Sequence, residues 1–544
     1  MAQLSSGGGT AWGGVGSSSQ GGASSGGSGV DGSSSGGTAW GGTASGGAGS
    51  SSGGVGSASG GSSSSTTGGS SAIPECRTNA ECMARATAAG DGSSVSAICV
   101  QSQCAKLASE DCKLLAGDVT DDNAILIGSL FPISSSTSTL SLQNSAQLAV
   151  EEIKGIPMMT GAGSRPVALV ACDSSADLLR AGRHLANDLQ VSAIIGPDGS
   201  QETLDLTQLV SIPAGVVTIT PAATAASIGT LDDNDLVWQM PLTDAQQAQL
   251  LIENINRLEV SLALGRPLRL SVTYRDDLLG VGTKDALTAG LYTNGKSIAD
   301  PNNAANVRLS SYSAKQTDYS TVVSAQTAFA PDIIVLAGGT ESVTKLMTPI
   351  EQQWTASSRP NYLFLNLANG PQLLTAVTSN NNLRLRVRGI GISASSASTS
   401  VYLEFLMAYT SRFGSSSVAW FAGQTYSAVY ALAYAFASSA SSPPTNAEIV
   451  AGLRRLSGGA LTVNVGSKDL TTAFIQLKSG KSVTGIGTDS ALTWDSQGVP
   501  ASGTVDTWCI GLSGSTPVFG SGGLSFRVDD HTFAGIYTPC GTLN

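Results

Sequence analysis

The chain has 544 residues, with 28 lysines and arginines against 39 aspartates and glutamates, so its formal net charge is −11. This length predicts roughly two to four structural units. The sequence contains no stripe of basic residues, and an acidic chain is repelled by the phosphates of nucleic acids and by anionic membrane surfaces. We therefore expect neither nucleic acid nor a lipid surface as a direct partner.

Residues 1–74 consist almost entirely of Gly, Ser, Ala and Thr, with Asp31 as their one charged residue. Such a segment cannot bury enough apolar surface to offset the entropy of ordering it. We expect a disordered tether over residues 1–74, with an end-to-end distance of about 45–50 Å.

The cysteines indicate an oxidising compartment. Five of the eight lie within residues 76–112, where no histidine is near and no Cys-x-x-Cys pair occurs, so disulfides are favoured over a zinc site. We expect a small Cys-rich disulfide segment at 75–117, with two bridges among its first four cysteines, and a further bridge between Cys509 and Cys540. Spacing does not fix the pairing, and all eight are disulfide candidates: Cys76, Cys82, Cys99, Cys104, Cys112, Cys172, Cys509 and Cys540.

The first four residues run directly into the Gly/Ser segment and carry no secretory signal. This conflicts with the cysteine usage. Our hypothesis is that the start codon has been placed too far downstream, and that the missing part holds a signal and a lipid-modified cysteine. The protein would then be periplasmic or on the cell surface, with the membrane reached only through that anchor. A stop codon directly before Met1 would contradict this hypothesis.

From about residue 122, apolar runs typical of buried parallel strands alternate with amphipathic helices, which are expected at 176–190 and 244–259. Alternating strands and helices predict a mostly parallel sheet, and their number predicts two α/β lobes. The uncharged stretch between Arg412 and Glu448 is interrupted by polar residues, so it predicts a buried helix rather than a membrane span. The expected strands are 125–130, 166–171, 192–196, 216–220, 268–274, 332–337, 361–366 and 388–393.

Residues 216–225 predict a binding site. A β-branched run ends at Pro221, and small residues with the Thr224 hydroxyl follow it. In open α/β sheets, ligands bind just beyond the carboxyl ends of strands, where small side chains leave backbone groups accessible. Ser200 follows the strand 192–196 in the same way, and the hydroxyl-rich loop 134–141, with Ser138, is expected to line the same crevice. These residues offer hydrogen bonds rather than catalytic chemistry.

Three other motifs have simpler interpretations. Residues 290–297 fit the phosphate-loop pattern, but a helix precedes them and an extended stretch follows, which is the reverse of the order that phosphate binding needs. His184 and His531 lie near no nucleophile elbow, so histidine-based catalysis is not expected. The acidic run 232–235 lacks the glycine and closing glutamate of a calcium loop and predicts a solvated turn.

Several segments together resemble type I periplasmic binding proteins of the leucine/isoleucine/valine-binding kind. The resemblance covers roughly residues 122–510, and the order of the motifs is more specific than any one of them. It is carried by Ile-Thr-Pro-Ala-Ala-Thr-Ala at 219–225 and by segments 125–135, 144–154, 193–200, 273–282, 425–436 and 492–498.

The resemblance implies a two-lobed α/β clamshell over residues 118–544, in which each lobe is a mostly parallel sheet flanked by helices. Lobe 1 would comprise 122–242 and 394–488, and lobe 2 would comprise 243–393 and 489–544. The chain would cross between them near 240–246, 390–396 and 487–493. Ligand would close the hinge, and the permease of an ABC transporter would recognise the closed form.

The resemblance also implies ligand-binding roles. Ser200, Ala222 and Thr224 match positions that hold the carboxylate and amino group of an amino acid. In the second lobe, Leu279 and Thr340 stand where the family has aromatic residues, and the acidic partner of the ammonium falls near Ala368, with no carboxylate close by. We expect an amino-acid-like or other small polar ligand, no cofactor, no metal and no catalysis. The alternatives are a cell-surface, envelope or sensory scaffold, and a hydrolase on the same frame.

Overall fold

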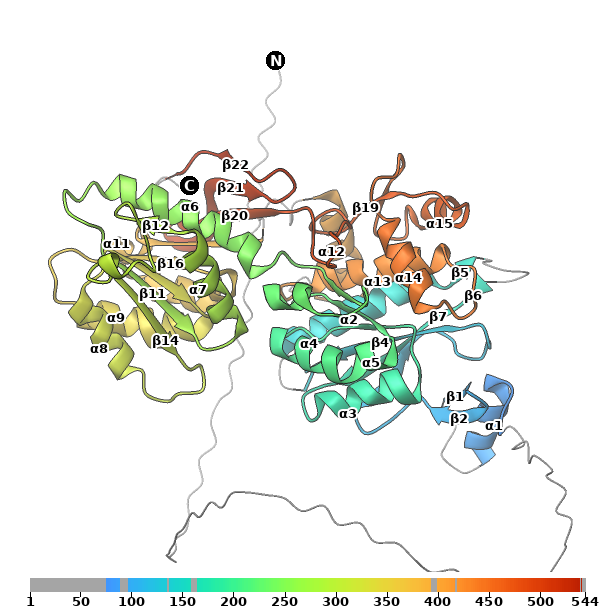
Figure 1. The fold of residues 1–544 in the computed structure, drawn as a ribbon. Helices are drawn as coiled ribbons and strands as arrows, with labels where there is room; N and C mark the ends of the chain where they lie inside the picture. Colours follow the sequence, from blue (N-terminus) through green and yellow to red (C-terminus); the bar gives the residue numbers. More distant parts are fainter. Residues whose placement is uncertain are drawn as a thin grey trace, which may run out of the picture. The chain divides into compact units, whose positions relative to one another are not determined.

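The computed structural model describes residues 75–88, 96–134, 137–157, 164–392, 399–415, 418–538 and 540. The predicted tether, residues 1–74, lies outside the described residues. The described chain contains two large sheets flanked by helices (Figure 1), as predicted for a two-lobed α/β protein. No helix within these ranges is long and apolar enough to cross a membrane.

The first lobe is built on a six-stranded sheet with the order β10-β9-β8-β4-β7-β3, in which only β3 is antiparallel to its neighbour. Alternate residues of β4 belong to different cores: Ile125 and Ile127 share one with α2 and with α13 (Ala422–Ala437), whereas Leu126 and Leu130 share the other with α3. Burial on both faces explains why the strands read as continuous apolar runs. The elements are β3 Cys112–Ala116, β4 Ile125–Phe131, β7 Val167–Asp173, β8 Ala193–Ile195, β9 Val217–Thr220, β10 Val237–Gln239, α2 Thr137–Ile153, α3 Leu178–Arg183, α4 Ser200–Leu206 and α5 Ile212–Ala214.

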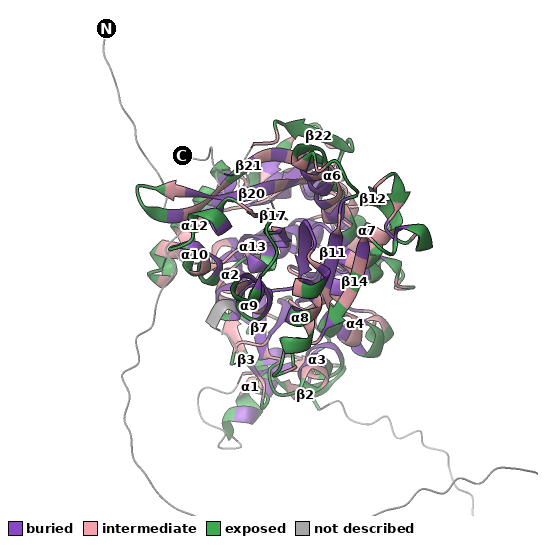
Figure 2. Cartoon of the chain, turned by 90° about the vertical axis from the view of Figure 1, so that its left-hand side faces the viewer, coloured by how far each residue is buried: buried purple, intermediate pink, exposed green. Residues whose placement is uncertain are grey.

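Helix α13, Ala422–Ala437, is the central helix of this lobe. Every one of its residues is buried (Figure 2), which confirms the predicted core helix. Two of its buried hydroxyls share one acceptor: those of Tyr426 and Tyr430 donate hydrogen bonds to Glu152 Oε2 at 2.5 and 2.7 Å. The lobe is completed by α12 Ser400–Phe413, α14 Asn446–Arg454, α15 Leu470–Lys478, the parallel pair β18 Thr462–Asn464 and β19 Thr484–Ile486, and the hairpin β5 Ile156–Pro157 and β6 Ser164–Arg165.

The second lobe is built on an eight-stranded sheet with the order β14-β11-β15-β16-β17-β20-β21-β22. The first five strands are parallel, and the last three are added antiparallel. Helices α6 and α7 cover one face and α8 to α10 the other. The elements are α6 Asp244–Leu262, β11 Leu270–Arg275, α7 Leu278–Gly290, β12 Tyr292–Thr293, β13 Lys296–Ser297, β14 Val307–Tyr312, α8 Ser320–Phe329, β15 Ile333–Ala337, α9 Thr348–Gln353, β16 Asn361–Phe364, α10 Pro371–Val377, α11 Asn381–Arg384, β17 Val387–Ile392, β20 Thr504–Ser513, β21 Thr516–Arg527 and β22 Thr532–Gly535.

All eight predicted strands are present, with ends that differ by only a residue or two. The third crossing between the lobes comes later than predicted, between Trp494 and Val505 rather than at 487–493. The reason is Trp494, whose ring packs edge-on against Trp238 at 5.2 Å and donates a hydrogen bond to the Gln239 carbonyl at 2.7 Å. These contacts hold the chain on the first lobe.

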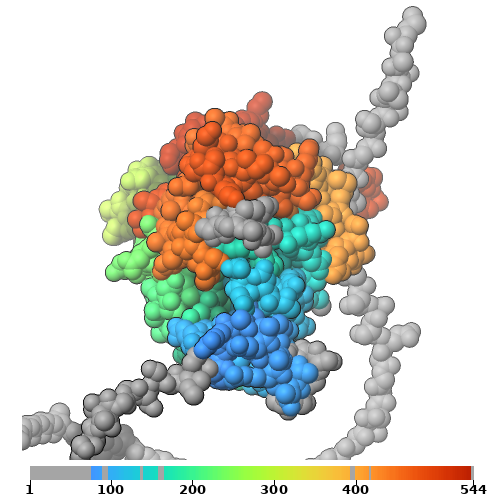
Figure 3. Space-filling model, turned by 90° about the vertical axis from the view of Figure 1, so that its right-hand side faces the viewer, coloured from blue at the N-terminus to red at the C-terminus, as the bar shows by residue number. Residues whose placement is uncertain are grey.

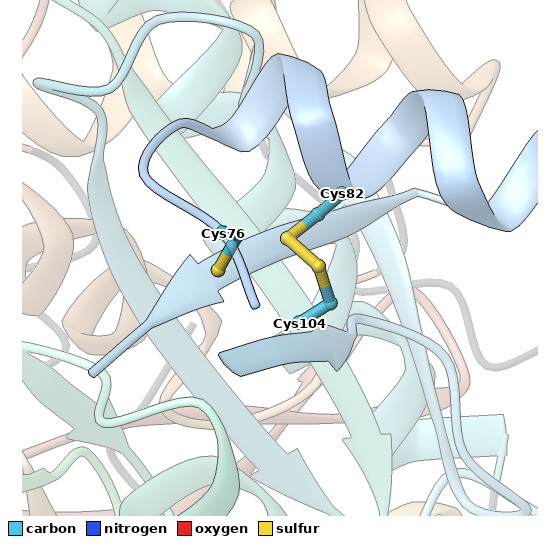
Figure 4. A group of neighbouring side chains, drawn as sticks. All are labelled: Cys76, Cys82 and Cys104. Carbon is cyan, nitrogen blue, oxygen red and sulfur yellow. A yellow bond between two sulfur atoms is a disulfide. The ribbon is translucent and has the colours of Figure 1, made fainter. Parts of the chain in front are cut away.

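The N-terminal cysteines form a small module of α1 Asn79–Ala88, β1 Ala97–Val100 and β2 Gln103–Lys106. Disulfides Cys76–Cys99 and Cys82–Cys104 connect these elements. Figure 4 shows the Cys82–Cys104 bond, with Cys76 beside it. The sulfurs of Cys76, Cys82 and Cys104 lie within 4.8 Å of one another, but each is already oxidised and offers no thiolate to a metal.

The module lies against the start of the first lobe (Figure 3), where the Asn79 amide donates to the Val119 carbonyl at 3.0 Å. The predicted Cys-rich segment, 75–117, extends past this module. Its last part is β3, which joins the main sheet and is linked to β7 by Cys112–Cys172. A fourth disulfide, Cys509–Cys540, has the pairing that the sequence suggested.

The phosphate-loop pattern has the structure expected from its reversed order. Helix α7 ends at Gly290, and the residues after it form the hairpin β12–β13. Asn294 and Gly295 occupy the turn with positive φ values of 56° and 72°. In the acidic run, the Asp233 carboxylate accepts the backbone N–H groups of Asp235 and Val237, so this run is a turn.

Candidate ligand-binding site

A cavity of about 590 Å³ is lined by residues of both lobes. Most of its wall comes from the carboxyl ends of β8, β9, β11 and β16 and from the first turn of α6, which is where open α/β sheets bind ligands. The lining residues are Thr139, Leu142, Asp198, Gly199, Ser200, Gln201, Glu202, Ala222, Thr224, Asp244, Gln247, Ala248, Arg275, Asp277, Leu278, Leu279, Thr283, Leu365, Asn366, Leu367, Ile390, Ala419, Trp420 and Phe421.

Four of the sequence-predicted site residues are together in this wall: Ser200, Ala222, Thr224 and Leu279. Thr340 is not among the lining residues. It is exposed, and its carbonyl accepts the Thr344 hydroxyl at 3.3 Å.

The side chain of Ser138 lies outside the described residues. Its helix contributes Thr139 and Leu142 to the lining instead.

The loop after β9 is held in place by hydrogen bonds that leave little freedom. The Thr220 hydroxyl donates to the Pro197 carbonyl at 2.8 Å and accepts the Ala223 N–H at 3.1 Å. Ser200 Oγ accepts the Ala225 N–H at 3.2 Å. These bonds join the β8 and β9 loops into one surface, so the groups that meet a ligand are positioned before it arrives.

Asp244 is the residue that the sequence did not single out. It is the first residue of α6, where the capping box of Thr243 and Gln246 begins the helix. Its backbone N–H donates to the Thr224 carbonyl at 2.8 Å, which connects the two lobes at the first crossing.

The Asp244 side chain is 4% exposed, and its Oδ2 has no hydrogen-bond partner among the described residues. The pKa of this carboxyl is raised to about 7, mainly because the group is buried. A hydrogen bond from Thr224 opposes this rise, and the nearby charge of Asp277 adds to it. A buried carboxylate therefore lines the cavity, although the sequence around Ala368 offers none.

Arg275 is the one guanidinium among the lining residues, and carboxylates of its own lobe already neutralise it. Its Nε donates to Asp277 Oδ2 at 2.5 Å and its Nη1 to Glu341 Oε1 at 3.3 Å. Asp277 also caps α7 by accepting the Gly280 N–H at 3.0 Å. The arginine therefore serves to order the β11–α7 loop.

The beginning of α4 carries two carboxylates of its own. Burial raises the pKa of Asp198, and the charge of Glu202 adds to this, while backbone hydrogen bonds from Asp198 and Gly199 oppose it. The Glu202 carboxylate folds back against Gly199 so closely that any Cβ there would collide with it. A side chain at position 199 would therefore displace the Glu202 carboxylate.

Residues 141–474 match the protein family described as "Receptor family ligand binding region". The chain belongs to this family. Its fold is that of the type I periplasmic binding proteins, as the sequence predicted.

Solved structures of substrate-binding and solute-binding proteins share this fold at low sequence identity. The substrate-binding protein LivJ of a Streptococcus pneumoniae branched-chain amino acid transporter, in complex with isoleucine, is 17% identical over 73% of this chain and 99% of its own, with a TM-score of 0.52. The leucine-binding protein LivK of Thermotoga maritima is also 17% identical, over 73% and 98%, with a TM-score of 0.53. A solute-binding protein of a Rhodopseudomonas palustris ABC transporter, in complex with 3,4-dihydroxybenzoic acid, is 12% identical over 75% and 98%, with a TM-score of 0.54. Among curated proteins, none matches the sequence.

Among the other polar residues of the cavity, Asn366 follows β16. It is 7% exposed, and neither atom of its amide has a partner among the described residues. Its Oδ1 lies where a side chain at Gly391 would have to be, so glycine at that position makes room for it. An unpaired amide that can donate and accept is suited to contact a ligand.

Proposed function

We propose that this protein is an extracytoplasmic solute-binding protein that captures a small polar or amino-acid-like ligand between its lobes and presents it to the permease of an ABC-type transporter. The observation that carries the proposal is the cavity between the lobes, into which two buried polar side chains, Asp244 and Asn366, bring hydrogen-bonding atoms without partners. Buried polar atoms without partners are costly, and a ligand that pairs with them recovers that cost.

The binding step needs no catalytic group. Among the described residues that line the cavity there is no histidine, cysteine or lysine, and its serine hydroxyl accepts a backbone N–H rather than facing a base. Ligand that contacts both walls favours the closed arrangement of the lobes, and the three crossing segments act as the hinge. A permease would distinguish the loaded protein by this closure.

The four disulfides support an extracytoplasmic location, because such bonds persist in oxidising compartments. The proposed lipid anchor at the N-terminus fits the same location. Membrane fractionation and mass spectrometry of the mature N-terminus test it: a lipid-modified cysteine is expected, and recovery of unmodified Met1 would contradict it.

The test of ligand binding is a thermal-shift screen of amino acids, organic acids, amines and sugars. Ala222→Trp fills the cavity and is expected to abolish the shift produced by any hit. Ala299→Trp, on an exposed loop outside the lining residues, is the matched control and should retain it. If no compound stabilises the protein while an envelope protein is captured specifically, the alternative of an envelope or sensory scaffold is supported instead.

A further inference from the structure

The charge of the cavity wall is strongly unbalanced. The lining contains four carboxyl groups, Asp198, Glu202, Asp244 and Asp277, against the single guanidinium of Arg275. That guanidinium is already engaged by Asp277 and by Glu341 behind it. A ligand that entered with a carboxylate would find no unpaired cation among the described lining residues.

The N-terminal end of α4 is equally unsuited to bind an anion. Asp198 accepts the N–H groups at the start of this turn, and Glu202 folds over Gly199 beside them. A ligand carboxylate placed there would meet two carboxylates of the protein, and like charges at close range repel. The protein's own acids thus occupy the region that the resemblance assigned to a ligand carboxylate.

Asp244, in contrast, is suited to bind a cation. Its side chain is buried, lines the cavity and has an Oδ2 without a hydrogen-bond partner among the described residues. An ammonium group donates up to three hydrogen bonds and neutralises the buried charge at the same time. The binding of a cation would therefore remove a cost that the empty cavity carries.

An organic cation fits the cavity better than a metal ion does. Within the described residues, the only set of three or more potential ligand groups that converge within 4.8 Å is the cysteine cluster of the N-terminal module, so the cavity carboxylates are too dispersed to coordinate one ion. Between them lie apolar side chains that suit an aliphatic or aromatic body: Leu142, Leu278, Leu279, Leu365, Ile390 and Trp420.

We infer that the ligand is an organic amine with an apolar body and no carboxylate, and that Asp244 binds its ammonium group. This inference rests on the proposed function and specifies its ligand class.

The test uses compounds that differ only in their charged groups, titrated into the full chain at pH 8 by calorimetry. L-Leucine carries both groups, 3-methylbutylamine lacks the carboxylate and 4-methylpentanoate lacks the amine; L-phenylalanine, 2-phenylethylamine and 3-phenylpropanoate form the aromatic set. We expect at least one amine to bind at least tenfold more tightly than its amino acid, and the acids not to bind.

Variants of cavity residues test whether the amine binds at this site. Asp244→Asn is expected to weaken amine binding about 10- to 100-fold, since it removes a charged partner. Glu404→Gln makes the same charge change on the exposed face of α12, outside the lining residues, and should leave the affinity unchanged. The double variant Asp198→Asn, Glu202→Gln is expected to improve L-leucine relative to the amine.

Two outcomes would overturn the inference and are distinguishable from each other. If L-leucine or 4-methylpentanoate binds more tightly than the matched amine, the ligand class is wrong while the proposed function stands. If no compound of either set binds and the wider thermal-shift screen also gives no hit, the inference and the proposed function fail together.

Discussion

Replacement of Asp244 by asparagine in the ligand-free protein tests the electrostatics of the cavity. The carboxyl is 4% exposed, and burial raises its pKa from 3.8 to about 7. A carboxyl whose pKa is higher in the folded than in the unfolded protein binds more protons when folded. Its contribution to stability is therefore fully present below pH 3.8 and is lost as the pH rises through 7.

The magnitude follows from these two pKa values. Relative to acid conditions, the raised pKa of Asp244 lowers the free energy of unfolding by about 4 kcal/mol at pH 8 and by about 1.5–2 kcal/mol at pH 5. Asparagine has a similar shape and no charge, so Asp244→Asn should be more stable than the parent protein at pH 8. That advantage should shrink by about 2–3 kcal/mol at pH 5.

Urea unfolding at a series of pH values between 5 and 8.5, followed by tryptophan fluorescence, gives the difference between the two proteins directly. Other titrating groups are common to both proteins and cancel in that difference. A stability difference that does not change with pH, or a variant that is less stable than the parent at pH 8, would refute the proposed state of Asp244.

Further predictions concern packing, cross-linking and binding. Gly389→Ala places a Cβ against the Trp508 ring and should destabilise the protein by about 1–3 kcal/mol or more in urea unfolding; an unchanged midpoint would contradict the packing of the second lobe. Replacing Cys112 and Cys172 by serine removes a link between residues 60 positions apart and should cost about 4 kcal/mol by the same measurement, and a loss below 1 kcal/mol would argue against this disulfide. Affinity for 3-methylbutylamine should rise between pH 6 and pH 8, because Asp244 ionises in this range while the amine remains charged; calorimetry that shows a flat or falling affinity would contradict this.

The strands and the central helix could be predicted because their physical signal is local. Strands buried on both faces are continuous apolar runs, and α13 has no charged residue to place it at a surface. The loop after β9 could be predicted equally well as a strand end with accessible backbone groups, since a Pro followed by small residues has few other interpretations.

The features that could not be predicted depend on contacts between distant residues. Trp494 delays the third crossing because it packs on Trp238, more than 200 positions earlier, and β3 joins the main sheet through β7. In sequence, Asp244 is an acid in the first turn of a helix, a position that is normally solvated. Only the burial of that turn against the opposite wall changes its role. Glu341 pairs with Arg275 in the same non-local way.

The central claim is that a small molecule binds between the two lobes. Hydrogen–deuterium exchange of the protein with and without the strongest hit of the ligand screen tests it most directly. The account predicts increased protection of both walls together, at residues 198–202 and 222–225 of the first lobe and at 244–248 and 275–279 of the second. Protection confined to segments outside these four, or no change at saturating ligand, would contradict it.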